Sequence, residues 1–385
     1  RSCYVTGVQT CALPICFLSQ NRTFFERKIR MYKKYVVVEG NAYSRGVQIG
    51  KELKNQISIN YQNQTKYYRD KEDFNYRKWG DIAKRYIPAM EKWTPEVVDE
   101  IRGMAEGAQM ELEQILALTT AYEKSFSRDM ISEKCTSFLL APKATYAQKV
   151  IVGQTNEECI LEWMNELDTV IHHIDNGKES LIYTHPGVPA YTGINNQGLA
   201  VLWEYVDNGR TGDGVPTNAI IRHLLECANV EEAVEFLKKV PHDVPNEFGL
   251  ADKSGKIVSV ECFPNKVYIG WDEQYLVHTN HIVFGKEETD YTRSIATKTQ
   301  YAEMENQIKK NLGDIDIEMA QNFLRSHENF PNSICAHPSP ERPWNRVLAA
   351  VVHDLTCGEM HVAFGNPCET EYKKYRFRKY LMSSR

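Results

Sequence analysis

The chain has 385 residues, of which 42% are hydrophobic and 25% are charged, and its formal net charge is −5. This balance is typical of a globular protein and excludes an intrinsically disordered chain. The acidic balance and the absence of a dense lysine/arginine run argue against a nucleic-acid partner. No apolar run reaches the roughly 18 residues that a membrane span requires, so we expect a soluble enzyme or binding protein.

The first segment, VTGVQTCALPI at residues 5–15, is unlike the rest of the chain. It resembles the translation of a sequencing-library adapter, and it lacks the basic start, long apolar centre and cleavage site of a signal peptide. We interpret residues 1–15 as an assembly artefact. Residues 1–30 are set aside as an artefact or a non-native N-terminal extension, and Met31 fits as a natural start.

The next hundred or so residues are predicted to be mostly helical. A β-branched strand, YVVVEG, ends at Gly40, and helical periodicity follows from about Tyr43. Pro95 suits the first turn of a helix, with Thr94 as its cap. Further helices are expected at about 73–86, 95–110 and 111–125.

From Cys135 onward the pattern changes to short β-rich runs separated by turn residues. Residues 195–198 (NNQG) and 252–255 (DKSG) predict hairpin turns. Helices interrupt the strands at about 216–240 and follow them at about 281–327, before two last strands. Segregated strands and helices predict an α+β fold in layers, and two sheets with helices outside both accommodate this order.

Cysteine usage favours a reducing compartment. Without the N-terminal stretch the chain has seven cysteines, an odd number with no CxxC pair, which is unlike a disulfide framework. We therefore expect a cytoplasmic protein. The seven are Cys135, Cys159, Cys227, Cys262, Cys335, Cys357 and Cys368.

Cys135 stands where a charged segment meets a predicted strand, in EKCTSFLLAP. A lone cysteine is most often a small buried apolar residue. If the bond between Lys134 and Cys135 were cut, Cys135 would carry a thiol together with an α-amine that titrates around 7.7–8.0. That amine could act as the general base for the thiol. Cys135 is thus either a core residue or a nucleophile that carries its own base.

Asn280 lies at the end of a β run in LVHTNH. An acyl-transfer enzyme needs hydrogen-bond donors for the oxyanion of its tetrahedral intermediate, and the Asn280 amide could supply one. The alternative is an Asx turn that ends the strand.

A zinc site is the competing interpretation of the late cysteines and histidines. Cys335 and His337 form one pair, and Cys357 and His361 form another a short distance later. Zinc accepts such ligands, but the spacing matches no known finger, and strand alternation could point His361 away from Cys357. We therefore predict no metal and no other cofactor.

Several segments in order resemble one known family. They run from about Tyr35 to Cys368 and are similar to the bacterial and fungal acyl-coenzyme A:6-aminopenicillanic acid acyltransferases. These are cysteine members of the N-terminal nucleophile (Ntn) hydrolases. The segments are GNAYSRGVQIGKEL, KCTSF, IVGQTNEE, GINNQGLAV, GVPTNAIIRHLLECANVEEAVEFL, GLADKSGKIVSVECFP, LVHTNH, ICAHP and HVAFGNPC.

The resemblance implies a four-layer αββα sandwich preceded by a helical N-terminal segment. It also implies an inactive precursor that cleaves itself before the cysteine. Residues 31–134 would be a helical leader and residues 135–385 the catalytic core. The two chains would pack as one domain in a non-covalent complex. The partner would be a small-molecule acyl substrate.

The resemblance also implies roles for individual residues. Cys135 matches the nucleophile, and Lys134–Cys135 the cleaved bond. Asn280 matches the oxyanion-side amide, and Glu157 the acidic residue that orients the terminal amine. A serine and an arginine of the family motif fall near Ser294 and Arg293.

Three departures from the family pattern matter. Lys134 stands where glycine is usual. Self-cleavage requires a strained peptide, and glycine permits that strain more readily than lysine does. Glu157 replaces an aspartate and is one methylene longer, and the serine/arginine pair has no clean match. We predict a cysteine amidohydrolase or N-acyltransferase. The alternatives are a catalytically degenerate binding protein on the same fold and, less favoured by the spacing, a zinc enzyme.

Overall fold

The structure is a computed structural model. It describes residues 32–72, 75–126, 134–158, 164–290, 295–340, 342–343 and 345–378. The chain divides into two compact units, Arg1–Lys33 and Lys34–Arg385. Every strand and helix reported below belongs to the second unit.

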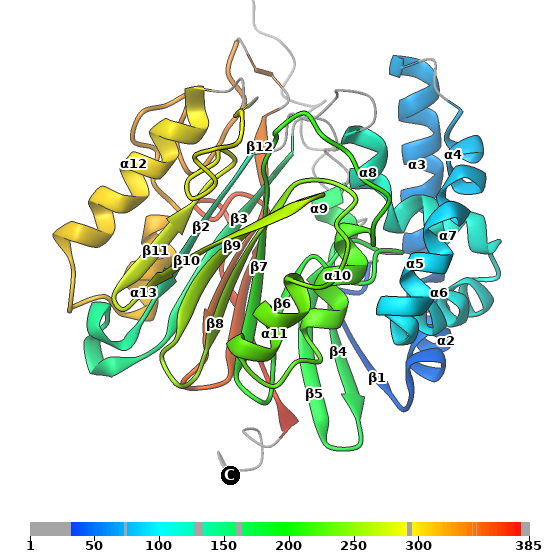
Figure 1. The fold of residues 1–385 in the computed structure, drawn as a ribbon, viewed down its shortest axis with the longest axis horizontal. Helices are drawn as coiled ribbons and strands as arrows, with labels where there is room; N and C mark the ends of the chain where they lie inside the picture. The colour runs from blue at the N-terminus through cyan, green and yellow to red at the C-terminus, as the bar shows by residue number, and fades with distance from the viewer. Residues whose placement is uncertain are drawn as a thin grey trace, which may run out of the picture. The chain divides into compact units, whose positions relative to one another are not determined.

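The larger of two sheets has eight strands (Figure 1). Its first strand, from the predicted leader, pairs in parallel with a strand of the predicted core, and the remaining pairs are antiparallel. The leader therefore supplies one edge of this sheet. In spatial order the strands are β1 (Tyr35–Glu39), β4 (Thr169–Asp175), β5 (Lys178–Thr184), β6 (Thr192–Asn195), β7 (Leu199–Tyr205), β8 (Asn246–Asp252), β9 (Ile257–Phe263) and β10 (Lys266–Asp272).

The smaller sheet has six strands, and all its pairs are antiparallel. In spatial order they are β11 (Tyr275–His278), β2 (Lys134–Leu140), β3 (Ile151–Glu158), β12 (Arg346–Asp354), β13 (Glu359–Phe364) and β14 (Lys373–Arg376).

The two sheets pack face to face through β2. Leu139 of β2 reaches Gly249 of β8, where a Cβ would lie 3.5 Å from the leucine Cδ1. Because side chains alternate along a strand, the neighbouring Phe138 and Leu140 enter a second apolar cluster on the other face of β2. Residues of β2 thus line two different cores, and Cys135 shares the inter-sheet face with Leu139.

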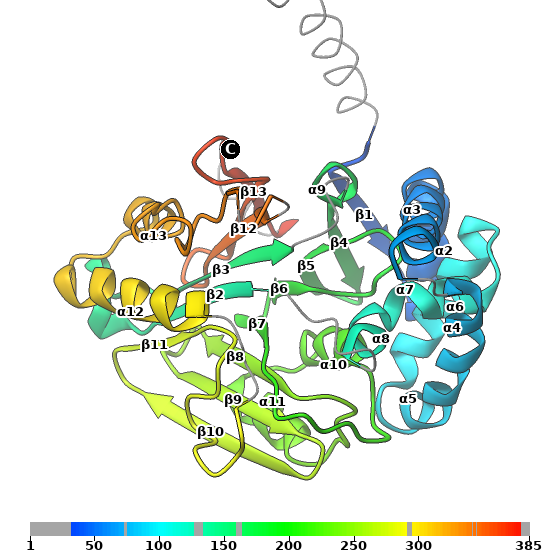
Figure 2. The ribbon, with the colours of Figure 1, turned by 90° about the horizontal axis from the view of Figure 1, so that it is seen from above.

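Helices cover the outer faces of both sheets (Figure 2). α12 (Ile295–Lys310) and α13 (Ile317–Phe323) contact β2, β3, β11 and β12 of the smaller sheet. α10 (Thr217–Leu224), α11 (Val230–Leu237) and α2 (Ala42–Glu52) contact β7, β8, β9 and β1 of the larger sheet. The order helix, sheet, sheet, helix confirms the predicted αββα sandwich.

The N-terminal segment is helical, as predicted, and its helices gather beside β1 in Figure 1. No helix within the described ranges is both long enough and apolar enough to cross a bilayer. With α2, the helices are α3 (Lys54–Glu72), α4 (Tyr76–Ala83), α5 (Ile87–Trp93), α6 (Pro95–Ala108), α7 (Leu112–Thr119) and α8 (Ala121–Phe126). α9 (Met164–Leu167) and the short 3₁₀ turns η1 (Lys84–Tyr86), η2 (Pro142–Ala144) and η3 (Tyr146–Gln148) complete the set of described helical elements.

Glycines bring α2 and α6 into direct backbone contact. A Cβ added at Gly46 would lie 2.1 Å from the carbonyl oxygen of Glu100, and one at Gly107 would lie 2.1 Å from that of Val47. These separations are far below a van der Waals contact, so only glycine allows the two helices to pack this closely.

Both predicted hairpin turns are confirmed. Asn195–Gly198 joins β6 to β7, and Asp252–Gly255 joins β8 to β9. Gly198 and Gly255 have φ values of 103° and 100°, a left-handed region that glycine adopts without strain. These turns fix the register of the strands that face Cys135.

Candidate active site

Cys135 lies near the start of β2, on the inter-sheet face, with 2% of its surface exposed. Its backbone N–H donates to Asn280 Oδ1 at 2.9 Å, and its Sγ lies 3.4 Å from Tyr191 Oη. Thiol and backbone nitrogen therefore both meet polar groups. This is more than a small apolar core residue requires.

Asn280 reaches Cys135 because β11 pairs with β2. His278 lies opposite Ser137, so Asn280, two residues after the strand, is level with Cys135. Its Nδ2 donates to the carbonyl oxygen of Tyr205 in β7 at 3.1 Å. The structure thus brings two predicted site residues into contact, and Asn280 also links the two sheets.

Glu157 lies beside the bond that is predicted to be cleaved. It pairs with Lys134 across β2 and β3, and its carboxylate is fully buried. Gln300 Nε2 on α12 donates to both its oxygens at 3.2 Å, and Thr155 Oγ1 donates at 3.1 Å. Arg293, the fourth predicted catalytic residue, lies outside the described residues together with Ser294.

A buried hydrogen-bond network extends from the thiol and was not predicted from the sequence. Tyr191 Oη donates to Asn156 Oδ1 at 2.8 Å, and Asn156 Nδ2 lies 3.4 Å from both Tyr183 Oη and His185 Nε2. Asp168 accepts from the Tyr183 hydroxyl and lies 2.6 Å from His185 Nδ1. These residues come from separate strands and loops, so no local spacing could have indicated them.

A row of buried glutamates crosses the larger sheet next to Cys135. Glu204 of β7 lies directly opposite Glu247 of β8, which lies opposite Glu261 of β9, and all three are 0% exposed. Among the described residues, neither oxygen of Glu204 has a well-aligned hydrogen-bond partner, although the Cys135 thiol and Ser137 hydroxyl are close enough to affect its pKa. Sequence analysis missed this row, although a glutamate inside the apolar run GLAVLWEYV was a usable signal.

Burial sets the ionisation of this glutamate row. It raises the pKa of Glu204 well above its usual value, and the neighbouring Glu247 raises it further. Burial likewise raises the pKa of Glu247 to about 7. Glu261 differs, because His278 and the N–H groups of a following loop outweigh burial and lower its pKa. The surroundings of Glu204 therefore favour its neutral form.

The Cys135 thiol is protonated in this uncleaved chain. Burial raises its pKa well above the usual value, and Glu204 adds to the shift, while the Tyr191 hydroxyl and the Glu157 backbone N–H act in the opposite direction. A thiol is a weak nucleophile until a base removes its proton. The thiol therefore needs a base before it can act as a nucleophile.

The alternative zinc set of Cys335, His337, Cys357 and His361 is wrong. Cys335 and His337 meet Cys368, with sulfur–sulfur and nitrogen–sulfur distances of 3.5 and 3.2 Å. Cys357 lies in the β12–β13 turn and accepts from Lys149 Nζ at 3.5 Å, and His361 contacts Glu359 within β13. The two pairs lie toward opposite ends of the β12–β13 hairpin, whose nine-residue first strand spans roughly 30 Å.

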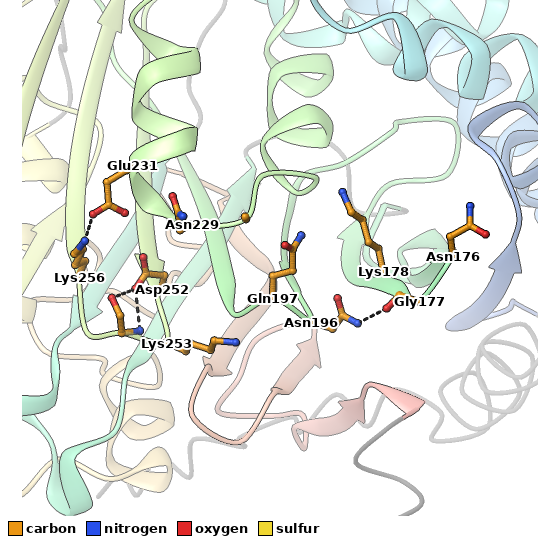
Figure 3. A pocket seen from close by; sticks show the side chains of 12 residues that line it. Asn176, Gly177, Lys178, Asn196, Gln197, Asn229, Glu231, Asp252, Lys253 and Lys256 are labelled. Atoms are coloured by element: carbon orange, nitrogen blue, oxygen red, sulfur yellow. Dashed lines mark hydrogen bonds and ion pairs between the residues drawn. The ribbon is translucent and has the colours of Figure 1, made fainter.

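An open cavity of about 770 Å³ lies beside the turn that precedes β7 (Figure 3). Side chains of the turns after β4, β6 and β8 line it. Asn280 places Cys135 at the Tyr205 end of β7, whereas the cavity adjoins the turn before Leu199, roughly 20 Å away along seven residues. The cavity is therefore not part of the site around Cys135.

Comparison with known proteins identifies the family. The family model "Acyl-coenzyme A:6-aminopenicillanic acid acyl-transferase" matches residues 169–369, which is more than half of the chain. The chain belongs to this acyltransferase family. The range matched by the acyltransferase model contains Asn280 and begins after Cys135 and Glu157.

A curated member of this acyltransferase family extends the likeness toward the N-terminus. The chain is 20% identical over 339 residues to the acyl-coenzyme A:6-aminopenicillanic-acid-acyltransferase 40 kDa form of Emericella nidulans. That match covers 86% of this chain and 93% of the fungal protein. The likeness therefore extends to both sides of Cys135.

Two solved structures are also similar. Penicillin V acylase from Agrobacterium tumefaciens has a TM-score of 0.36 and 15% identity, covering 60% of this chain and 74% of that chain. A mutant of the conjugated bile acid hydrolase from Clostridium perfringens has a TM-score of 0.38 and 14% identity, covering 63% of this chain and 97% of that chain. Scores this low carry no argument about the site of this acyltransferase-family chain.

Proposed function

We propose that this chain is an Ntn-type cysteine amidohydrolase or N-acyltransferase. It would act on an acyl amide or acyl thioester through an acyl-enzyme on Cys135. Family membership supports the reaction class. The observation that carries the assignment of the nucleophile is the setting of Cys135, whose thiol faces Tyr191 and whose backbone nitrogen faces Asn280 inside a buried polar site.

Self-cleavage would supply the missing base. Cys135 Sγ attacks the carbonyl carbon of Lys134, the C–N bond breaks, and the nitrogen takes the thiol proton to become an α-amine. Water then hydrolyses the resulting thioester to give a Lys134 carboxylate and a thiol. The new amine forms at the nitrogen that now donates to Asn280 Oδ1 at 2.9 Å, and Glu157, opposite Lys134, would hold its ammonium form.

Turnover would follow the same chemistry on a substrate. The α-amine takes the thiol proton, the thiolate attacks the acyl carbonyl, and the leaving amine or thiol takes the proton from the ammonium. Asn280 and a backbone N–H would stabilise the oxyanion. An asparagine Nδ2 carries two protons, so an amide that donates to Tyr205 can donate to an oxyanion as well.

The acyl-enzyme thioester would pass its acyl group to water or to an amine. Hydrolysis and transfer differ only in this acceptor, and hydrolysis is the simpler of the two. The penicillin substrate of named relatives does not come with the fold, because members of one fold carry different substrates on different site residues.

After cleavage, leader and core would remain a non-covalent two-chain complex. β1 pairs with β4 along five residues, so the leader completes the larger sheet. Glu100 on α6 of the leader accepts from Arg222 on α10 of the core at 3.1 and 3.0 Å, and both side chains are 1% exposed. Dissociation would expose an apolar face together with two buried charges.

The test is the intact mass of the purified protein under denaturing conditions. We expect two chains, the larger beginning at Cys135, and a Cys135→Ala variant that stays unbroken. Incubation with an acyl thioester, quenched in acid, should then add one acyl group to the larger chain at Cys135. An unbroken wild-type chain whose Cys135 takes no acyl group would refute the proposal.

One observation favours a second candidate, a catalytically degenerate binding protein. Lys134 continues β2 in extended conformation, paired with Glu157, so the peptide before Cys135 begins as part of a regular strand. Self-cleavage requires a strained peptide, which glycine permits more readily than lysine. The same mass measurement separates the candidates, because a binding protein would stay unbroken and unacylated.

A further inference from the structure

Four metal-binding side chains converge on loops beside α13 and at one end of the β12–β13 hairpin. They are His327, Cys335, His337 and Cys368, and their ligand atoms all lie within 4.8 Å of one another. Cys335 Sγ is 3.5 Å from Cys368 Sγ and 3.6 Å from His337 Nε2, which is 3.2 Å from Cys368 Sγ. Residues up to 41 positions apart in sequence thus meet at one point.

We propose that these four residues form a structural Zn²⁺ site of the Cys₂His₂ type. With Zn–S bonds of about 2.3 Å and Zn–N bonds of about 2.0–2.1 Å, tetrahedral ligand atoms lie about 3.3–3.8 Å apart. The sulfur–sulfur and sulfur–nitrogen distances here are 3.2–3.6 Å. Two sulfur and two imidazole donors suit zinc and do not suit the hard cations Mg²⁺ and Ca²⁺.

Hydrogen bonds already hold the sulfur ligands in place. The backbone N–H of Cys335 donates to the carbonyl oxygen of Ser326 at 2.9 Å. Asn366 Nδ2 donates to the carbonyl oxygen of Ala336 at 2.6 Å and lies 3.6 Å from Cys335 Sγ. Since Asn366 stands two residues before Cys368, one side chain joins both cysteine loops.

The ring of His337 points its Nε2 at the two sulfurs. Glu369 Oε1 lies 4.0 Å from the far nitrogen, Nδ1, which is beyond a hydrogen bond. A carboxylate on that nitrogen commonly fixes the ring of a zinc-bound histidine, and Glu369 is the residue placed to move into that role. Four protein ligands leave no open coordination position, so the site is structural and not catalytic.

The site connects to the region around Cys135 through one glutamine. Ser333 donates its hydroxyl to the carbonyl oxygen of Cys335 at 2.9 Å, and its own carbonyl oxygen accepts from Gln300 Nε2 at 2.9 Å. The same Nε2 donates to Glu157. A metal that fixes the Cys335 loop would therefore steady Gln300 and Glu157; this consequence rests on the proposed function, whereas the metal site does not.

The test is the metal content of the full chain, purified under reducing conditions and measured by mass spectrometry of the elements. We expect one Zn²⁺ per chain, and at least a tenfold loss in Cys368→Ser, whose side chain is exposed and whose substitution should leave the fold intact. The matched control is Cys357→Ser, because Cys357 lies outside the cluster and should leave the zinc content unchanged.

Two further readouts do not depend on activity. Co²⁺ added to metal-free protein should give the visible absorption of a tetrahedral thiolate site in wild type and in Cys357→Ser, and not in Cys368→Ser. A chelator should lower the melting temperature of the same two proteins. The proposal would be overturned if wild-type protein takes up neither Zn²⁺ nor Co²⁺. It would also be overturned if the mass of the native protein shows a disulfide between Cys335 and Cys368. Either outcome would count even if self-cleavage and turnover are normal.

Discussion

Two groups of buried charge in this protein are built on opposite principles. Where leader meets core, Glu100 accepts two hydrogen bonds from Arg222 at 3.1 and 3.0 Å. Beside Cys135, Glu204 and Glu247 lie next to each other on adjacent strands. Within the described part of the chain, the carboxylate of Glu204 has no hydrogen-bonded cationic partner. The first group pairs unlike charges, and the second sets acid against acid.

The pKa values follow this difference. Burial works against the charged form of Glu100, but Arg222 and His173 outweigh it and hold the pKa well below the usual range. Burial raises the pKa values of Glu204 and Glu247. Glu247 raises the pKa of Glu204 further, and Glu261 raises that of Glu247. Removing one partner of a buried ion pair is strongly destabilising, whereas groups kept in an unfavourable state commonly mark a functional site.

The largest expected effect tests whether the glutamate row surrounds a catalytic centre. Cys135→Ala should lower acyl turnover by roughly 10⁴-fold or more, as loss of a nucleophile does, and should leave the chain uncleaved. The fold should persist, because the substitution removes one small buried atom whose hydrogen-bond contact is with Tyr191 Oη at 3.4 Å. Steady-state turnover and intact mass measure both outcomes, with Cys357→Ser as the control. Undiminished turnover would remove Cys135 from the mechanism.

The next effect concerns the paired group. In an uncleaved Cys135→Ala background, Glu100→Ala should reduce the free energy of unfolding by roughly 3–5 kcal/mol, because it leaves Arg222 buried without its main partner. The control is Glu91→Ala, which removes a half-exposed ion pair with Arg102 and should change stability by about 1 kcal/mol or less. Equal losses in denaturant titrations would show that burial does not distinguish these pairs.

The two groups should respond to pH with opposite signs. Glu247 has a raised pKa of about 7, so its contribution to stability is full below its unfolded value and is lost as pH rises through about 7. Glu247→Gln should remove that loss and gain up to roughly 3 kcal/mol on the wild type by pH 8. Glu100 contributes above its unfolded pKa and loses its contribution as pH falls toward its lowered one.

Unfolding free energies between about pH 5 and pH 8 measure the loss from Glu247, and the loss from Glu100 is measured below about pH 4. Parallel curves for wild type and Glu247→Gln would mean that Glu247 is ionised in the folded protein. In that case the acid row would carry charge, and the contrast with the Glu100 group would disappear.

The smallest effect separates two roles of Asn280. Asn280→Ala should lower turnover by roughly 100-fold, or about 2.7 kcal/mol, if its amide donates to the oxyanion. Asn280→Asp keeps the oxygen that accepts from the Cys135 nitrogen and loses the donor. If the aspartate variant is as slow as the alanine variant, the donor matters. If it retains activity, Asn280 serves to hold the terminal amine.

Local sequence patterns predicted the layers and the hairpins because turn chemistry and hydrophobic periodicity act over a few residues. The glutamate row could not be predicted in the same way, since it depends on the register of β7, β8 and β9 together. Cys135 and Asn280 are 145 residues apart, so no local spacing connects them, and acyl-transfer chemistry together with the family resemblance indicated Asn280. The alternative zinc set grouped the wrong side chains, because short spacing in sequence suggested neighbours that the β12–β13 hairpin separates.

The parallel pairing of β1 with β4 has a consequence for refolding. An uncleaved chain completes the larger sheet in a first-order process, because both strands belong to one molecule. Once the peptide before Cys135 is cut, the same sheet can be rebuilt only when two separate chains collide, so recovery from full denaturation becomes second order. Refolding yield would then fall on dilution for the cleaved protein and stay constant for the uncleaved chain. At low concentration, a cleaved protein that has been fully denatured would therefore not regain its fold.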